Sequence, residues 1–222
     1  MTTQTATNYF EIVTRLPADA VVVFRHVGWE DYEELLAQVG EASGLRLSYN
    51  DGILTAMTLG TEHESYAEFI KSLVGIVRLR LRLNIRFFGS ATLKRADQRK
   101  GLEPDACFYV QRAEELGNRM QLDFEHDPPP DVAVEIDVHH SSEEKLSIYV
   151  ALGVPEVWRY DGQRLSMFVL RGVGYEEVER SQALPVLTSE VVTEFLARLQ
   201  RDGELQALLA FDEWLGAQIE RS

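Results

Sequence analysis

The chain has 222 residues, 45% hydrophobic and 26% charged, which is ordinary for a globular protein with a well-buried core. Its single cysteine, Cys107, excludes an internal disulfide framework, and its apolar runs are too short to cross a membrane. The N-terminal stretch lacks a basic segment followed by an apolar one. We therefore expect a cytoplasmic protein with no signal peptide and no membrane partner.

The charge is unevenly distributed along the chain. The net charge of −14 by itself argues against a nucleic-acid partner. Residues 71–100, however, carry nine Lys or Arg against one acid, which gives this segment a charge of +8 and the remainder −22. Such a segment could hold a polyanion, or it could be a solvated face that offsets acids elsewhere in the fold.

The first half of the chain alternates helical and β patterns. Apolar residues in 28–40 have helical spacing, and Asn50-Asp51-Gly52 between two β-rich runs predicts a hairpin. Residues 61–83 contain the longest helical pattern. Residues 84–95 and 104–110 are typical of short strands.

The second half begins with a polar connection and ends in helices. We expect the following elements: a surface connection over 111–130, a strand over 131–138, a helix over 141–154 with a Ser141 and Glu144 capping box, strands over 155–161, 163–172 and 175–181, and two helices within 187–218 that separate near Asp202-Gly203. This order predicts one mixed α/β domain over 1–222, with its core at about 28–180 and a helical extension at 187–218.

The strand at 131–138 has one aliphatic face and one acidic face. Alternation places Asp131, Glu135 and Asp137 together. Asp131 and Glu135 are four residues apart, roughly 13 Å, which is too far for one metal ion. Glu135 and Asp137 are separated by only about 7 Å and could border one site. If the strand containing Pro104-Asp105 pairs with this one, Asp105 could converge with Glu135.

Two carboxylates from neighbouring strands suit a hard divalent cation such as Mg²⁺, for which Mn²⁺ is a possible substitute. Lys145 lies in the first turn of the following helix and could steady charge on a transferring phosphoryl group. Tyr149, one turn later, shares its helix face. The alternative is that the acids point into solvent and that Lys145 pairs with a neighbouring acid on the surface.

Several stretches in order resemble the Uma2 (DUF820) family of predicted endonucleases, which belongs to the PD-(D/E)XK restriction-endonuclease-like superfamily. The stretches are "SYNDGILTAM", "TEHESYAEFIKSL", "FFGSATLKR", "GLEPDACFYV" and "PPPDVAVEIDVHHSSEEKLSIYVALGVPEVWRYD". The resemblance implies an α/β fold with a central mixed β-sheet flanked by helices. It also implies that Asp105 and Glu135 are metal ligands, together with the backbone carbonyl of Ile136.

The chain departs from this pattern at one position. The motif's lysine would fall at 137, where the sequence has Asp137, so Lys145 is the candidate replacement. His63 matches a histidine of the family's first long helix and is expected to line the site. The resemblance implies a Mg²⁺-dependent endonuclease acting on a nucleic acid, which we expect to be DNA bound by residues 71–100.

Two other interpretations stay open. A nuclease-like domain with an acid at position 137 could be catalytically inactive and serve as a nucleic-acid-binding or protein-interaction module. The helices within 187–218 carry apolar stripes at helical spacing, which are more often core or dimer contacts than a ligand site. We therefore expect a homodimer.

Overall fold

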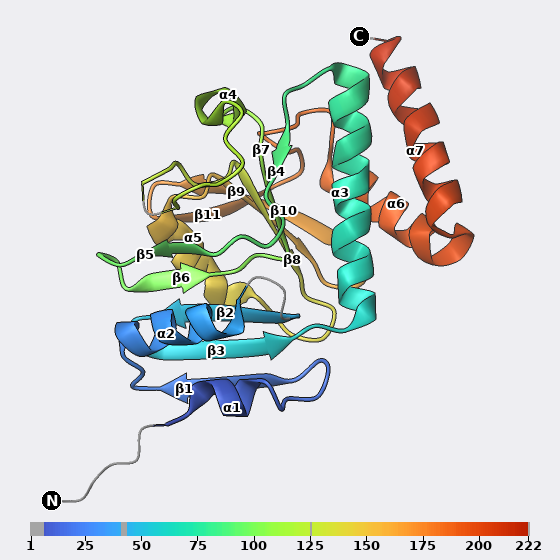
Figure 1. Ribbon diagram of the computed structural model, residues 1–222. Helices are drawn as coiled ribbons and strands as arrows, with labels where there is room; N and C mark the ends of the chain where they lie inside the picture. The colour runs from blue at the N-terminus through green and yellow to red at the C-terminus, as the bar shows by residue number, and fades with distance from the viewer. Residues whose placement is uncertain (1–6, 41–43, 125, 222) are drawn as a thin grey trace, which may run out of the picture.

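Two β-sheets organise the computed structural model, which describes residues 7–40, 44–124 and 126–221 (Figure 1). We expect no signal peptide in the N-terminal stretch. The first residues of that stretch, 1–6, lie outside the described residues. The five-stranded sheet has the order β1 (Val21–Arg25), β3 (Ile53–Thr58), β2 (Leu45–Asn50), β6 (Lys100–Leu102) and β5 (Leu93–Arg95). The six-stranded sheet has the order β11 (Gly174–Val178), β10 (Leu165–Arg171), β9 (Glu156–Tyr160), β8 (Val132–Ile136), β7 (Ala106–Tyr109) and β4 (Arg86–Phe87).

The five-stranded sheet grows from the predicted β2–β3 hairpin. Asn50 and Ile53 are register partners, and both turn residues, Asp51 and Gly52, have positive φ, as a two-residue hairpin turn requires. The edge strand β1 pairs with β3 and with no other described strand. Helices α1 (Tyr9–Val13) and α2 (Trp29–Val39) cover one face of this sheet (Figure 1).

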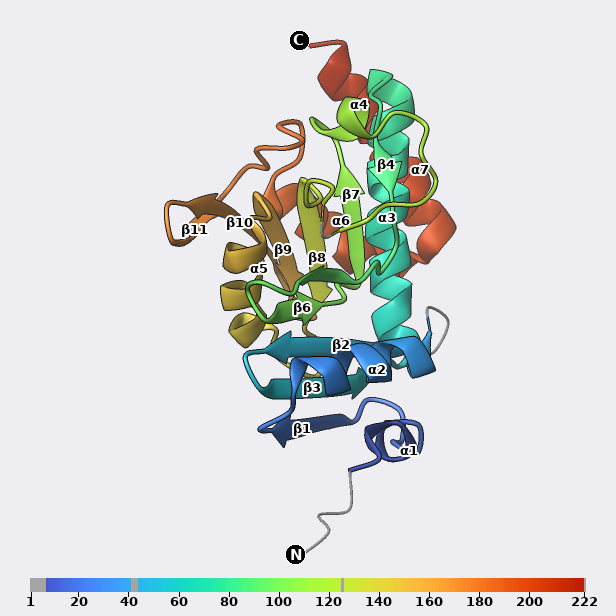
Figure 2. The same cartoon turned by 60° about the vertical axis from the view of Figure 1, so that its left-hand side comes forward.

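The six-stranded sheet is mixed, because β8 and β9 run parallel whereas its other neighbouring strands are antiparallel. The β8–β9 crossover contains a 3₁₀ turn (Glu143–Lys145) and helix α5 (Leu146–Leu152), which covers one face. Helix α3 (Thr61–Leu81) packs on the opposite face with α6 (Ser189–Asp202) and α7 (Glu204–Ile219), as Figure 2 shows. The predicted central mixed sheet flanked by helices is confirmed.

Strand β8 lies at the centre of the fold and is buried on both faces. Val132, Val134 and Ile136 pack towards α3, as the predicted aliphatic face requires. Ala133 packs towards α5 on the other face, where Glu135 is also fully buried. The acidic face of this strand therefore points into the protein and not into solvent, so each acid on it needs a partner.

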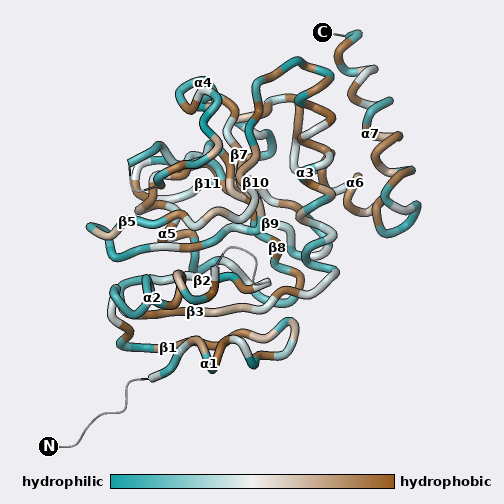
Figure 3. The backbone as a smooth tube through the Cα atoms, viewed as in Figure 1, coloured by the Kyte–Doolittle hydropathy of each residue, from teal (hydrophilic) through white to brown (hydrophobic). Residues whose placement is uncertain are grey.

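The C-terminal helices break where the sequence predicts, because Gly203 between them adopts a positive φ of 85°. Hydrophobic and hydrophilic residues alternate along α7 (Figure 3), and Leu205 and Leu209 on it are exposed. The homodimer stays a prediction. No helix in the described ranges is long and apolar enough to span a bilayer.

Three local features differ from the sequence expectations. The capping box of Ser141 and Glu144 does not form; Ser141 Oγ accepts a hydrogen bond from the Glu143 amide, and the segment opens with the 3₁₀ turn. The 111–130 connection contains the short helix α4 (Ala113–Leu116). Residues 7–27, for which no element is predicted, contain α1 and β1. Strand β1 forms by pairing with β3 at the open edge of the β2–β3 hairpin.

Candidate active site

Asp105 and Glu135 are neighbours at one end of the β7–β8 pair. The register pairs Ala106 with Val134, and the Asp105 amide donates to the Val134 carbonyl at 3.0 Å. Asp105 Oδ2 in turn accepts a hydrogen bond from the Ile136 amide at 2.7 Å. Three of the predicted site residues, Asp105, Glu135 and Ile136, therefore meet through the pairing of two strands.

Helix α5 and the turn before it supply two partners for Glu135. The Lys145 Nζ atom lies 2.6 Å from Glu135 Oε2, and the Tyr149 hydroxyl donates to Glu135 Oε1. Lys145 and Tyr149 are four residues apart and lie on one helix face, as the sequence predicts. Lysine and tyrosine thus fix both oxygens of one buried carboxylate.

Asp105 is bordered by two further side chains. His63, near the start of α3, places Nε2 3.1 Å from Asp105 Oδ2, although without the direction of a hydrogen bond. Arg46 of β2 places Nε 3.6 Å from Asp105 Oδ1, and its Nη2 reaches Glu64 at 3.3 Å. The Arg46 side chain is only 11% exposed. The site therefore draws on both sheets and on α3.

Burial and mutual charge shift the acid pKa values in opposite directions. Burial raises the pKa of Glu135 to about 7; Lys145 opposes this shift and the charge of Asp105 adds to it. Burial also acts to raise the pKa of Asp105, but His63 and Lys145 outweigh it, so that this pKa is lowered. Burial acts to lower the pKa of Lys145, yet Glu135 and Asp105 raise it overall and keep the ammonium charged.

Several polar atoms at this point have no hydrogen-bond partner. They are buried and belong to three neighbouring residues: Asp105 Oδ1, Arg46 Nε and both ring nitrogens of His63. Unpaired buried polar atoms are costly, so a cluster of them marks a place where a ligand, ion or water belongs. A cavity of about 260 Å³ lies next to this cluster and is lined by Arg46, Glu135 and Lys145.

Asp137, at the position of the motif's lysine, is tied to a different set of partners. Arg159 Nη2 lies 2.6 Å from its Oδ2, and the Ser142 amide donates to its Oδ1 at 2.9 Å. The carboxylate lines the cavity, but these bonds hold it to β9 and to the loop before α5. The lysine that contacts Glu135 is Lys145, on the following turn, and it does not come from position 137.

The residues fit a hard divalent cation. No group of three or more His, Cys, Asp or Glu side chains with metal-binding geometry occurs among the residues that the structure describes. Mg²⁺ does not need such a cage, since it is commonly held by one or two carboxylates, with water and substrate phosphate completing its shell. Asp105 Oδ1, which accepts no hydrogen bond, offers one oxygen ligand, and each Glu135 oxygen keeps lone pairs beyond its single bond.

The basic segment 71–100 does not form one patch beside the site. Four of its nine cationic side chains lie in ion pairs with acids: Lys71 with Glu68, Arg80 with Asp212, Lys94 with Glu33 and Arg99 with Asp51. The segment continues along α3, passes through β4 of the six-stranded sheet and then enters β5 and β6 of the five-stranded sheet (Figure 1). Its role in nucleic-acid binding stays a prediction.

The sequence argument did not identify Arg46. The signal was present, because Arg46, Ser48 and Asn50 alternate with the apolar residues Leu45, Leu47 and Tyr49, so that β2 has one polar face. Only the pairing of β2 with β6, which leads directly into Asp105, shows what that face approaches. This long-range contact has no local sequence signature.

Comparison with known proteins is consistent with this geometry. Residues 29–200 match the family described as "Uma2: Putative restriction endonuclease". The chain belongs to the Uma2 family. A crystal structure of a "putative nuclease belonging to DUF820" from Anabaena variabilis superposes with a TM-score of 0.52 at 13% identity, covering 77% of this chain and 99% of that one. A search of curated proteins gave no match. For this Uma2 chain, the structural likeness establishes the restriction-endonuclease-like fold.

Proposed function

We propose that this Uma2 chain is a Mg²⁺-dependent nuclease that hydrolyses phosphodiester bonds in nucleic acid. The observation that carries the proposal is the convergence of Asp105, Glu135 and Lys145 beside buried polar atoms that lack partners. The printed descriptions of the family and of the Anabaena protein name the same class of activity.

Asp105, Glu135 and the Ile136 carbonyl would hold the cation. When bound, Mg²⁺ would neutralise a phosphate oxygen and lower the pKa of a nearby water. In the reaction, a water oxygen bonds to phosphorus while the bond from phosphorus to one sugar oxygen breaks. One proton of the water passes to the leaving sugar oxygen and the other to solvent, so that the products are a phosphate end and a hydroxyl end.

The side chains around the acids then have distinct tasks. Tyr149 and Lys145 orient Glu135, and the Lys145 ammonium can offset charge that grows on the phosphoryl oxygens. His63 borders Asp105 and shields it from solvent on the α3 side. Arg159 neutralises the charge of Asp137. Asp137 therefore adds no unpaired negative charge at the place where the substrate phosphate would lie.

The test is cleavage of labelled single- and double-stranded DNA and RNA in Mg²⁺, Mn²⁺ or EDTA. Wild-type protein should cleave with either metal and not in EDTA, whereas Asp105→Asn and Glu135→Gln should lose activity. Glu213→Gln, on the exposed side of α7, is the matched control and should keep it. Equal cleavage by all proteins would indicate a contaminating nuclease. Absence of cleavage on every substrate would favour the inactive binding module.

A further inference from the structure

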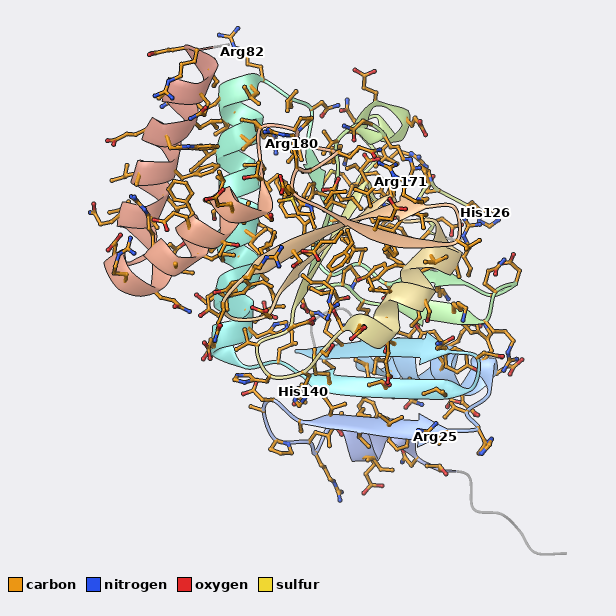
Figure 4. All side chains as sticks on the ribbon, turned by 180° about the vertical axis from the view of Figure 1, so that it is seen from behind. Arg25, Arg82, His126, His140, Arg171 and Arg180 are labelled. Atoms are coloured by element: carbon orange, nitrogen blue, oxygen red, sulfur yellow. The ribbon has the colours of Figure 1, made fainter. Side chains whose placement is uncertain are left out.

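One wall of the active-site cavity carries apolar side chains beside polar ones. Strands β1, β3 and β2 present one face to the cavity, and register places Val21, Met57 and Arg46 in one row across it. Val23, Thr55 and Ser48 form the next row. The opposite face of the same sheet is covered by α1 and α2, so the cavity face is the free one (Figure 4).

Val21 and Val23 are unusual for an active site. They are 38% and 48% exposed, whereas Val22 and Phe24 of the same strand pack into the core. Facing them across the cavity are Glu135 and Lys145. A phosphate gains nothing from an apolar wall, but an organic group attached to that phosphate would.

The wall is held in place at the end nearest the acids. The His140 Nε2 atom lies 2.9 Å from the Asp19 carbonyl, which joins the loop after β8 to the turn that leads into β1. Thr58 and Ala20 exchange two hydrogen bonds at 3.0 Å across the β1–β3 end. Figure 4 shows His140 beside these strands. The apolar wall is thus a built part of the cavity.

We infer that this wall contacts the base of a nucleotide and that the site acts on single-stranded or locally unpaired nucleic acid. The inference rests on the proposed nuclease function and names its substrate class. A base inside a duplex has both faces stacked on its neighbours, so that only an unpaired base offers a face to Val21 and Val23. The phosphate of the same nucleotide then lies towards Lys145 and Arg46.

The cavity is too small for more than a single nucleotide. Its volume of about 260 Å³ lies just below the ~300 Å³ at which sites for small organic ligands begin. The β1 part of the wall, Val21 and Val23, precedes residue 29, where the match to the family begins.

The experiment measures binding, in EDTA so that a metal-dependent site cannot cleave. Fluorescence anisotropy compares a short oligothymidylate, the abasic backbone of the same length and a duplex of that length. The variant is Val21→Ser with Val23→Ser. Val173→Ser is the matched control, since Val173 is 95% exposed at the β10–β11 turn. The pair Val21→Thr and Val23→Thr keeps the β-branched shape in case the serine variant does not fold.

We expect wild-type protein to bind the oligothymidylate more tightly than the duplex or the abasic backbone. The serine pair should weaken binding of the oligothymidylate ~5-fold or more and leave binding of the abasic backbone unchanged. The effect of the substitutions then depends on whether the probe carries bases, as a contact between the wall and a base requires. The threonine pair should shift binding in the same direction. The control should match wild type.

Three outcomes overturn the inference: tighter binding of the duplex, equal weakening on the oligothymidylate and abasic probes, or no effect of either variant pair. A failure of the base contact can be distinguished from a failure of the proposed nuclease function. Cleavage of duplex with no preference for single strands would preserve the nuclease and remove the base-contact wall. Base-dependent binding without cleavage in Mg²⁺ or Mn²⁺ would preserve the wall and remove the nuclease.

Discussion

The two ends of β8 and β9 both bury acids, but they satisfy them in different ways. At the first end, Asp131 accepts hydrogen bonds from the amides of Val110 and Arg112 at 2.7 and 3.0 Å. Glu156 accepts from the Trp158 indole at 2.6 Å and from two amides of the loop after β11. Every one of these carboxylates is satisfied by fixed donors of the fold.

At the other end, Glu135 is held by the side chains of Lys145 and Tyr149, and one oxygen of Asp105 has no hydrogen-bond partner. At the first end, amides and the Trp158 indole satisfy the acids and leave little to exchange. Side-chain donors beside unpaired atoms leave a carboxylate that can take a new ligand. Burial of an acid therefore does not by itself mark a functional site; the nature of its partners does.

The prediction with the largest expected effect compares the same substitution at the two ends. Glu135→Gln should reduce cleavage ~10³-fold, because it removes a charged ligand and the partner of Lys145. Glu156→Gln makes the same chemical change at the other end and should keep wild-type turnover per folded molecule. The measurement is initial cleavage rate in Mg²⁺, normalised to the folded fraction. Equal losses would mean that the two ends do not differ in function.

The reverse pattern is expected for stability. Glu156→Gln turns one acceptor into a donor, so at least one of the Trp158, Gln182 and Ala183 donors loses its bond. Charged hydrogen bonds contribute roughly 1.5–3 kcal/mol each, and we expect the free energy of unfolding to fall by about 2 kcal/mol. Urea denaturation followed by circular dichroism measures it. An unchanged midpoint and slope would contradict a structural role for Glu156.

Part of this contrast was accessible from the sequence. Period-two alternation placed Asp131, Glu135 and Asp137 on one face, and helical spacing placed Lys145 and Tyr149 together. These are local patterns, and each one is confirmed as geometry. The sequence also favoured Glu135 over Asp131, through its possible convergence with Asp105. Which acid meets amides and which meets a lysine depends on loops and strands far away in the chain, so the partners of each acid could not be predicted.

The features that the sequence missed are likewise long-range. Arg46 reaches Asp105 only because β2 pairs with β6, and Arg159 neutralises Asp137 only because β9 runs parallel to β8. Strand β1 is five residues long and acquires its role from β3 and from the cavity beside it. No periodicity within residues 7–27 indicates that neighbourhood.

A pH-dependent effect follows from the raised pKa of Glu135. In metal-free protein, its folded pKa of about 7 lies above the ordinary value of 4.5, so that between these values the folded state binds more protons than the unfolded state. Its contribution to stability is therefore complete below pH 4.5 and is lost as pH rises towards 7, with a slope of at most about 1.4 kcal/mol per pH unit.

The measurement is the urea midpoint of metal-free protein across this window. Glu135→Gln should flatten the slope, whereas Glu156→Gln should shift all midpoints and keep it. Asp105 contributes in the opposite sense, because its lowered pKa gives stability that is lost only as pH falls below the ordinary value of 3.8. A slope that survives in Glu135→Gln would assign the titration to another group.

The smallest expected effect separates the two ends through a single hydroxyl. Tyr149 donates to Glu135, and Tyr109, also buried, donates to the Pro128 carbonyl at 2.7 Å near the Asp131 end. Tyr149→Phe and Tyr109→Phe each remove one hydrogen bond and should each cost about 1 kcal/mol of stability. Only Tyr149→Phe should slow cleavage, by ~10-fold or less in kcat with KM little changed, because it frees Glu135 to turn without removing a ligand. Equal rates in the two variants would show that Lys145 and the strand pairing alone orient Glu135, and that its second hydrogen bond is structural, like those at the other end.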